Sequence, residues 1–346
     1  MRKTIRMEHV RAPIQILQIA LGLVIMWPSL SIAKNDRQQQ AEAYLARAHE
    51  LSDIRCAACP PFRLKTRVQF YRRDQTTSTV EIGSYVLVWQ SKLRWREELN
   101  FPNTHSVRWG LEGKLWREDS FEYPPLRVVQ LEDLVSFPVR LLPLDGVMLN
   151  ILPKKSTKGG SLPCVEKQIH RTSIGAQCFD SVSGALTQEA GSYGDYEYAD
   201  LLTAGAKSFP RNLRALEEGK VAVQIDVEEI RTGTLLEDAL FIPSGKAVSE
   251  PVCDGGARIE LAKLIRMDRP SYPAAARAAG VQGIVGGFGV VGPDGKLHGL
   301  EIVHSLSPEV DAAALAAWRQ WEYRPTFCQG LPTLVPTHLE TTFSLK

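Results

Sequence analysis

The chain has 346 residues, more than one hydrophobic core usually organises, so two domains are expected. Charged residues make up 23% of the chain and the formal net charge is +2, which gives no electrostatic reason to expect nucleic acid as a partner. The composition does not suggest disorder.

Residues 1–33 have the pattern of an export signal. Several basic residues precede an apolar run from Ile14 to Trp27, and a small-x-small sequence ends at Ala33. A membrane-spanning helix needs about 20 apolar residues. This run is shorter and is interrupted by Gln15 and Gln18. Cleavage after Ala33 is therefore preferred to the alternative, an uncleaved N-terminal anchor.

Export to an oxidising compartment would explain the cysteines. Cys164 and Cys178 lie in adjacent strand-like runs, where a disulfide would join a hairpin. Cys253 and Cys328 then remain to pair by elimination, and zinc binding by these thiols is the alternative.

The remaining pair, Cys56 and Cys59, has the spacing of a redox motif. Pro60 and Pro61 follow, whereas a redox motif of this kind opens a helix after a strand. A local structural disulfide is therefore favoured over a thiol redox site.

Residues 38–243 begin with a predicted helix, from Gln38 to Leu51. Apolar and polar residues then alternate from Phe62 to Phe70 and again from Val80 to Gln90, and three further short strands follow. Five strands joined by short turns indicate an antiparallel sheet rather than a βαβ array. A helix is expected from Val128 to Arg140, and strands return until Ile230.

This first region resembles the LolA/LolB-like fold, a curved antiparallel half-barrel with helices in its concavity. The resemblance rests on Gly83-Ser84-Tyr85-Val86-Leu87-Val88-Trp89, Arg94-Trp95-Arg96-Glu97-Glu98, Gly113-Lys114-Leu115-Trp116 and Cys178-Phe179-Asp180. In that family the cavity holds lipid acyl chains. The resemblance implies a periplasmic lipid or lipoprotein carrier, with the cavity-lining candidates Tyr85, Leu87, Trp89, Trp95, Trp109 and Trp116. The alternative is that these aromatic residues fill the core of a curved sheet.

Residues 244–260 contain Gly245, Pro251, Gly255 and Gly256 and are expected to be a linker. The last region, 261–346, is predicted to be a small αββαβ domain. Its elements are a helix from Ala274 to Ala279, strands from Ile284 to Val291 and from Lys296 to His304, a helix from Asp311 to Trp321, and a strand from Val335 to Leu345. The whole chain is thus assigned to the α+β class.

The last region closely resembles the TonB C-terminal domain. Several short motifs occur in the order of that family, and their main residues are Pro270, Tyr272, Pro273, Gly280, Gly283, Trp321, Tyr323 and Pro325. In the family, the last strand lies at a sheet edge and pairs with an extended segment of a TonB-dependent outer-membrane receptor. The resemblance implies that this partner is bound by Val335, Thr337, His338, Leu339, Glu340, Thr341, Thr342 and Phe343. Such pairing is β-augmentation, in which an open edge offers unpaired main-chain groups.

Two departures bear on a force-transducing role in energy-coupled transport. An ExbB/ExbD-type inner-membrane motor would require an uncleaved N-terminal helix, whereas residues 1–33 look cleavable. A globular domain also stands where the family has a long proline-rich spacer. A periplasmic protein of a Gram-negative-type bacterium is expected, anchored to the inner membrane only if residues 1–33 are retained.

No catalytic arrangement can be singled out, so we expect a non-enzymatic protein without cofactor or metal. The run Gly287 to Gly292 matches a dinucleotide-binding pattern, but a hairpin turn follows it in place of a helix N-terminus. His298 and His304 are predicted to face solvent rather than a metal, because no carboxylate or thiol cluster accompanies them.

Overall fold

A computed structural model describes residues 29–73, 78–136, 147–157, 160–169, 172–191, 193–233, 236–252 and 259–345. The expected export signal lies outside these residues, apart from its last few positions, which begin the first helix. None of the helices within the described ranges is long and apolar enough to cross a membrane.

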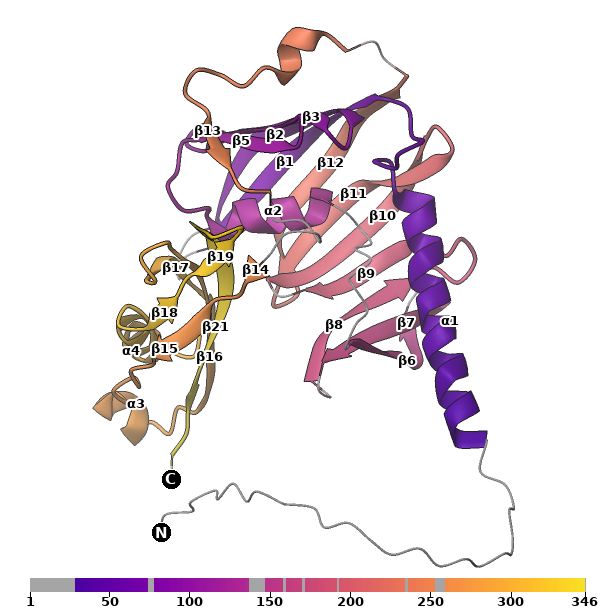
Figure 1. Cartoon of the computed structure of the whole chain (residues 1–346). Coiled ribbons are helices and arrows are strands. Elements are labelled where there is room, and N and C mark those ends of the chain that lie inside the picture. Colours follow the sequence, from indigo (N-terminus) through magenta and orange to yellow (C-terminus); the bar gives the residue numbers. More distant parts are fainter. Residues whose placement is uncertain are drawn as a thin grey trace, which may run out of the picture.

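The larger unit is a curved, antiparallel, 13-stranded sheet with the order β13-β5-β4-β3-β2-β1-β12-β11-β10-β9-β8-β7-β6. Figure 1 shows the sheet bending around a concave side without closing. Its strands are β1 (Phe62–Arg73), β2 (Ser78–Ser91), β3 (Arg94–Asn100), β4 (His105–Leu111), β5 (Lys114–Asp119), β6 (Val147–Thr157), β7 (Gly160–Ile169), β8 (Thr172–Phe179), β9 (Leu186–Gly191), β10 (Gly194–Ala204), β11 (Lys207–Glu217), β12 (Lys220–Thr232) and β13 (Val248–Glu250). The antiparallel half-barrel expected from the sequence is therefore confirmed.

The period-two pattern of the strands places one face of the sheet in the core. In β1, Phe62, Leu64, Val68 and Phe70 are each at most 1% exposed, whereas Arg63, Lys65, Arg67 and Gln69 face away. Their partners across the ladder continue the same face, as in the pair Val68 and Ile225 of β12. This alternation fixes the register, because a slip by one residue would turn the apolar side chains to solvent.

Two helices cover the inner face of the sheet (Figure 1). Helix α1 (Ser29–Ser52) lies along β6 and β11, and α2 (Leu126–Ser136) lies over β11 and β12. From α1, Leu45 and Ala48 enter the core, and from α2, Leu131 and Leu134 do so. The expected helix after Val128 thus begins two residues earlier; its predicted end lies outside the described residues.

Disulfides form between Cys56 and Cys59 and between Cys164 and Cys178, as expected. The second pair joins residues that are directly opposite in β7 and β8, with their Cα atoms 4.0 Å apart. Cys328 is also disulfide-bonded, and Cys253, its expected partner, lies outside the described residues.

The described first part of the expected linker, up to Val252, packs against the half-barrel. Just before this segment, the short helix η1 (Asp238–Phe241) lies on the outer side of β3 and β4, with Phe241 buried beneath the guanidinium of Arg94. Strand β13 then pairs with β5, and the Glu250 carboxylate forms an ion pair with Arg117. One edge of the large sheet is thereby covered.

The smaller unit has the expected αββαβ core. Its elements are α3 (Ala274–Ala278), β16 (Gly283–Val291), β17 (Leu297–His304), α4 (Pro308–Trp318) and β21 (Val335–Phe343). The three long strands form a sheet in the order β17-β16-β21. Additional short strands surround this core, namely β14 (Ile259–Glu260), β15 (Lys263–Arg266), β18 (Glu322–Arg324), β19 (Thr326–Cys328) and β20 (Leu331–Thr333).

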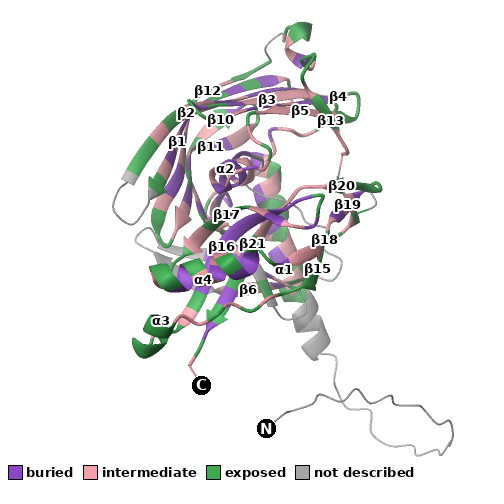
Figure 2. Ribbon diagram, turned by 90° about the vertical axis from the view of Figure 1, so that its left-hand side faces the viewer, coloured by how far each residue is buried: buried purple, intermediate pink, exposed green. Residues whose placement is uncertain are grey.

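Helix α4 packs on one face of this small sheet through Trp318, which is fully buried. A Cβ atom at Gly287 of β16 would lie 2.3 Å from the Trp318 ring, so only glycine allows the ring to approach the strand. Gly287, the first glycine of the dinucleotide-like pattern, therefore serves helix packing. Figure 2 shows the buried residues of α4 turned toward this sheet and its exposed residues turned away.

Candidate recognition edge and groove

Strand β21 is an edge strand. All nine of its residues are in register with β16, from Val335 opposite Val291 to Phe343 opposite Gly283. In the described part of the chain it pairs with no strand on its other side. Edge strands of this kind carry unpaired main-chain N–H and C=O groups. The strand that the sequence assigned to partner binding is thus an edge strand with an open ladder.

The side chains of β21 alternate between the core and the exterior. Leu339, Thr341 and Phe343 are buried against α4, whereas His338, Glu340 and Thr342 are exposed. Val335 and Thr337, at the start of the strand, are half-buried. The indole Nε1–H of Trp318 donates a hydrogen bond of 2.9 Å to the Thr341 hydroxyl. The buried half of the strand is therefore fixed by the core while the exposed half is free to contact another chain.

A groove of about 330 Å³ lies at the C-terminal half of β21. It is lined by Met267, Asp268, Arg269, Pro270, Tyr272, Trp321, Glu340, Thr341, Thr342, Phe343 and Ser344. Its walls are the end of β21 and the segment before α3. The Trp321 indole holds that segment in place by donating a 2.9 Å hydrogen bond to the carbonyl oxygen of Asp268.

Three residues of the family motif, Pro270, Tyr272 and Trp321, line this groove. The Tyr272 ring packs edge-on against Phe343, and its hydroxyl donates to the carbonyl oxygen of Val281. Pro273 caps the start of α3, and Gly280 ends the helix turn with φ of 69°.

Three further motif residues position strands. Gly283 begins β16 with φ of 148°, a conformation that favours glycine. The Tyr323 amide donates to the carbonyl oxygen of Gly295 in the hairpin turn, and Pro325 lies beside the same turn. The motif therefore fixes the frame that presents β21.

The charged residues Asp268, Arg269 and Glu340 line the groove, and other ion pairs lie elsewhere on the smaller unit. A side-chain hydrogen bond from Arg266 lowers the pKa of Asp268. The Lys296 ammonium, 2.6 Å from the Glu322 carboxylate, lowers the pKa of that group. His338 and Glu340 approach to 3.2 Å on the exposed side of β21.

A third apolar cluster joins the two units. It comprises Leu126, Val129, Phe288 and Val290, with Tyr123, Tyr193, Val303 and Leu334 around them. Helix α2 thus has one face in the half-barrel core and another on the sheet that contains β21. The periodicity of α2 indicated only a single apolar face, so sequence reasoning missed this contact.

Polar contacts surround the cluster. The amide of Leu126, in the first turn of α2, donates to Glu301 of β17 over 3.3 Å. The rings of Tyr123 and His298 stack with their centroids 4.0 Å apart. His304 forms an ion pair with Glu218 in the turn between β11 and β12. The two histidines that were considered as metal ligands therefore contact other side chains: His298 contacts Tyr123 and Asp294, and His304 contacts Glu218.

The lipid-cavity candidates lie on two different faces of the large sheet. Tyr85, Leu87, Trp89 and Trp95 share the inner face, since Trp89 is opposite Trp95 in the ladder. Trp109 and Trp116 are opposite each other on the outer face. The inner four lie under the helices. The cavity beside Tyr85 has a volume of about 10 Å³, roughly the space for one water molecule.

An ion pair lies beside the small cavity next to Tyr85. The guanidinium of Arg108 in β4 lies 2.6 Å from the carboxylate of Glu132 in α2. Burial raises the pKa of Glu132 to about 7 in spite of this partner. Burial also raises the pKa of Tyr85 well above its usual value.

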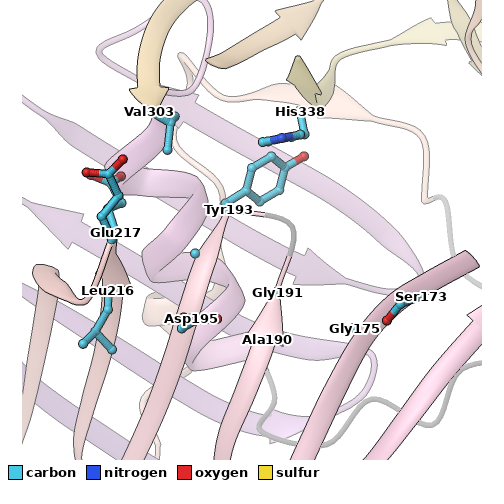
Figure 3. Close-up of a pocket in the computed structure, with 12 residues that line it drawn as sticks. Ser173, Gly175, Ala190, Gly191, Tyr193, Asp195, Leu216, Glu217, Val303 and His338 are labelled. Carbon is cyan, nitrogen blue, oxygen red and sulfur yellow. The ribbon is translucent and has the colours of Figure 1, made fainter. Parts of the chain in front are cut away.

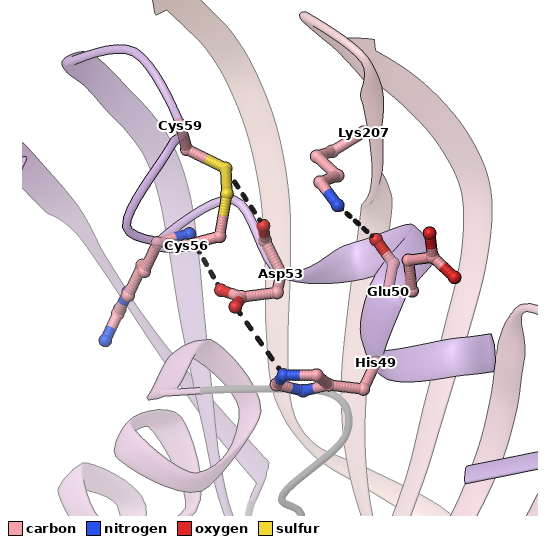
Figure 4. Close-up of a disulfide and its surroundings, with 7 residues drawn as sticks. His49, Glu50, Asp53, Cys56, Cys59 and Lys207 are labelled. Carbon is pink, nitrogen blue, oxygen red and sulfur yellow. Dashed lines mark hydrogen bonds and ion pairs between the residues drawn. A yellow bond between two sulfur atoms is a disulfide. The ribbon is translucent and has the colours of Figure 1, made fainter. Parts of the chain in front are cut away.

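The Cys56–Cys59 disulfide lies just beyond the end of α1 (Figure 4). His49 and Asp53 form an ion pair at 3.6 Å next to it, and Lys207 donates to the carbonyl oxygen of Glu50. Between the two cysteines and α2, Arg55 donates to the carbonyl oxygen of Val135. The disulfide thus constrains the short connection between the end of α1 and the start of β1.

The smaller unit is an α+β domain in which β21 is paired on one side only among the described residues. Residues 268–345 match the family described as Gram-negative bacterial TonB protein C-terminal. The chain therefore carries a TonB C-terminal domain, as its sequence motifs indicated.

Solved structures similar to this chain are distant. An outer-membrane lipoprotein-sorting protein domain from Vibrio parahaemolyticus aligns at 12% identity over 58% of this chain and 97% of its own, with a TM-score of 0.34. A LolA superfamily protein from Nitrosomonas europaea aligns at 13% identity over 59% and 97%, with a TM-score of 0.32. No curated protein sequence matches the chain. These similarities are remote, and the half-barrel is described by its own strand order.

Proposed function

We propose that this chain is a periplasmic protein of the TonB family whose β21 pairs with an extended N-terminal segment of a TonB-dependent outer-membrane receptor. In this way it would support energy-coupled transport. The observation that carries the proposal is the open edge of β21, a nine-residue strand with a ladder on one side only among the described residues. Main-chain bonds along such an edge provide affinity, and pockets for alternate side chains provide specificity.

The groove beside β21 supports the same function. A strand added to the edge would lie next to the segment from Met267 to Tyr272, with apolar contact from Trp321 and Phe343. The disulfides fit an oxidising periplasm. The proposal is one of binding and includes no catalytic step. An ExbB/ExbD-type motor belongs to it only if residues 1–33 stay on the mature protein.

A main-chain test avoids any change to the protein. A strand uses the N–H groups of alternate residues on each of its edges. Two versions of a synthetic receptor N-terminal peptide, N-methylated at odd or at even positions, would be titrated into the full chain by fluorescence anisotropy. We expect one version to lose binding and the other to retain it. Equal loss in both, or no binding of the unmethylated peptide, would rule out edge pairing.

A further inference from the structure

A cavity of about 460 Å³ lies between the rim of the half-barrel and the sheet that contains β21. Figure 3 shows Tyr193 and His338 on one side of it and the strands that carry Gly175 and Ala190 on the other. The ring of Tyr193 is turned toward His338. The cavity is therefore lined by both structural units, with Val303 and His338 from the smaller unit and the other lining residues from the half-barrel.

His338 connects this cavity with the recognition edge. It is opposite Phe288 in the ladder, and Phe288 is buried against α2, so His338 lies on the half-barrel side of the sheet. A strand added to β21 would place the side chain opposite His338 on the same side, within about 5 Å. That side chain would point toward the cavity.

The lining of the cavity has a defined chemistry. Gly175, Ala190 and Gly191 have small or no side chains and leave room for a long one. The exposed carboxylate of Asp195 has no polar partner among the described residues. The two other carboxylates in the lining already have partners. Glu217 accepts hydrogen bonds from Arg127 and Gln130, and Glu218 pairs with His304. Asp195 thus gives the cavity an uncompensated negative charge beside the aromatic ring of Tyr193.

We propose that the half-barrel rim is a second wall of the peptide site and selects Lys or Arg at the position that pairs opposite His338. A long basic side chain crosses the cavity, meets the Asp195 carboxylate and stacks near Tyr193, which combines an ion pair with a cation–π contact. This inference rests on the proposed edge pairing and assigns to the half-barrel a direct share in recognising the same partner.

The experiment is a charge scan with the full chain. The probe is the receptor N-terminal peptide in a series in which each position in turn carries Lys or Glu, with Kd measured by fluorescence anisotropy. We expect one position at which Lys binds about fivefold more tightly than Glu, the size of a partly exposed ion pair. The preference should shrink in about 0.5 M NaCl, because the electrostatic screening length is then only about 4 Å.

The variant Asp195→Lys should reverse the preference at that position only. Asp36→Lys is the matched control, because Asp36 is also an exposed aspartate and lies on α1, away from the cavity. Binding without a position-specific preference, or a preference that Asp195→Lys and Asp36→Lys change equally, overturns the inference and leaves edge pairing intact. Absence of any peptide binding overturns both.

Discussion

At the scale of single residues, Glu132 is the group whose charge the fold disfavours. Its carboxylate is half-buried between α2 and β4, and its pKa is raised from 4.5 to about 7. The folded protein therefore holds a proton on Glu132 at pH values where the unfolded chain has released it. The corresponding stability is fully present below pH 4.5 and is lost as the pH rises through about 7.

Glu132→Gln should consequently reduce the fall in stability between pH 5 and pH 8, roughly the interval that the raised pKa spans. Urea midpoints at several pH values provide the measurement. Glu98→Gln is the matched control, since Glu98 is also a half-buried partner of an arginine in the same sheet. A Gln variant whose pH profile runs parallel to that of the unchanged protein would contradict the assignment.

Single residues also show what could be read from the sequence. The motif residues Tyr272 and Trp321 predicted their domain correctly, because their positions follow from local turns and one nearby strand. The inner or outer placement of Trp95 and Trp109 could not be predicted with the same ease. It depends on register across three strands, where a shift of one residue exchanges the faces.

At the scale of elements, α2 is stabilised by groups from distant parts of the chain. Pro125 precedes the helix and has no side-chain acceptor, so the carboxylate of Glu301 accepts from the first-turn amide. At the other end, Arg55 donates to the carbonyl oxygen of Val135. Each charge has the sign that opposes the helix dipole at its end.

Glu301→Gln should therefore lower the free energy of unfolding by about 0.5–1 kcal/mol, the usual size of a charge effect at a helix end. The comparison variant is Glu340→Gln, on the same sheet but exposed and distant from α2, which we expect to change stability by less than about 0.5 kcal/mol. Guanidinium titrations of both variants distinguish these values. Equal effects would mean that Glu301 does not act through the helix.

Sequence periodicity recovered many long strands of the half-barrel and the core of the C-terminal domain, but it did not indicate the strands β6 and β11. The short strands from β18 to β20 could not be predicted in this way, because a strand of three residues is too short to show a periodic pattern. The second apolar face of α2 escaped it as well. Leu126 and Val129 look like ordinary members of one amphipathic helix until the distant strand β16 is placed against them.

For the whole molecule, the shared cluster predicts that the two units respond to change together. Phe288 is fully buried at their junction. Phe288→Ala should cost about 3–5 kcal/mol, as large-to-small changes in a core do. Hydrogen exchange should then accelerate in α2 as well as in β16, although the two are far apart in the sequence.

Ile284→Ala is the control for this experiment, because Ile284 lies on the same strand and the same sheet face but is 45% exposed. Its effect should be smaller and confined to β16. If Phe288→Ala accelerated exchange in β16 while α2 kept its protection, the cluster would not couple the units.

The shared helix α2 also limits how this protein can be divided or recombined. A cut in the expected linker at residues 244–260 separates Phe288 and Val290 from α2, the helix that buries them. The excised domain then exposes an apolar, aggregation-prone patch on its sheet. An exchange of half-barrels between homologous chains has the same result unless α2 is inherited with the C-terminal domain. The part of the chain that must be kept together is therefore discontinuous in sequence, because it comprises α2 and the C-terminal domain. Substitutions at Leu126 or Val129 require matching changes on β16.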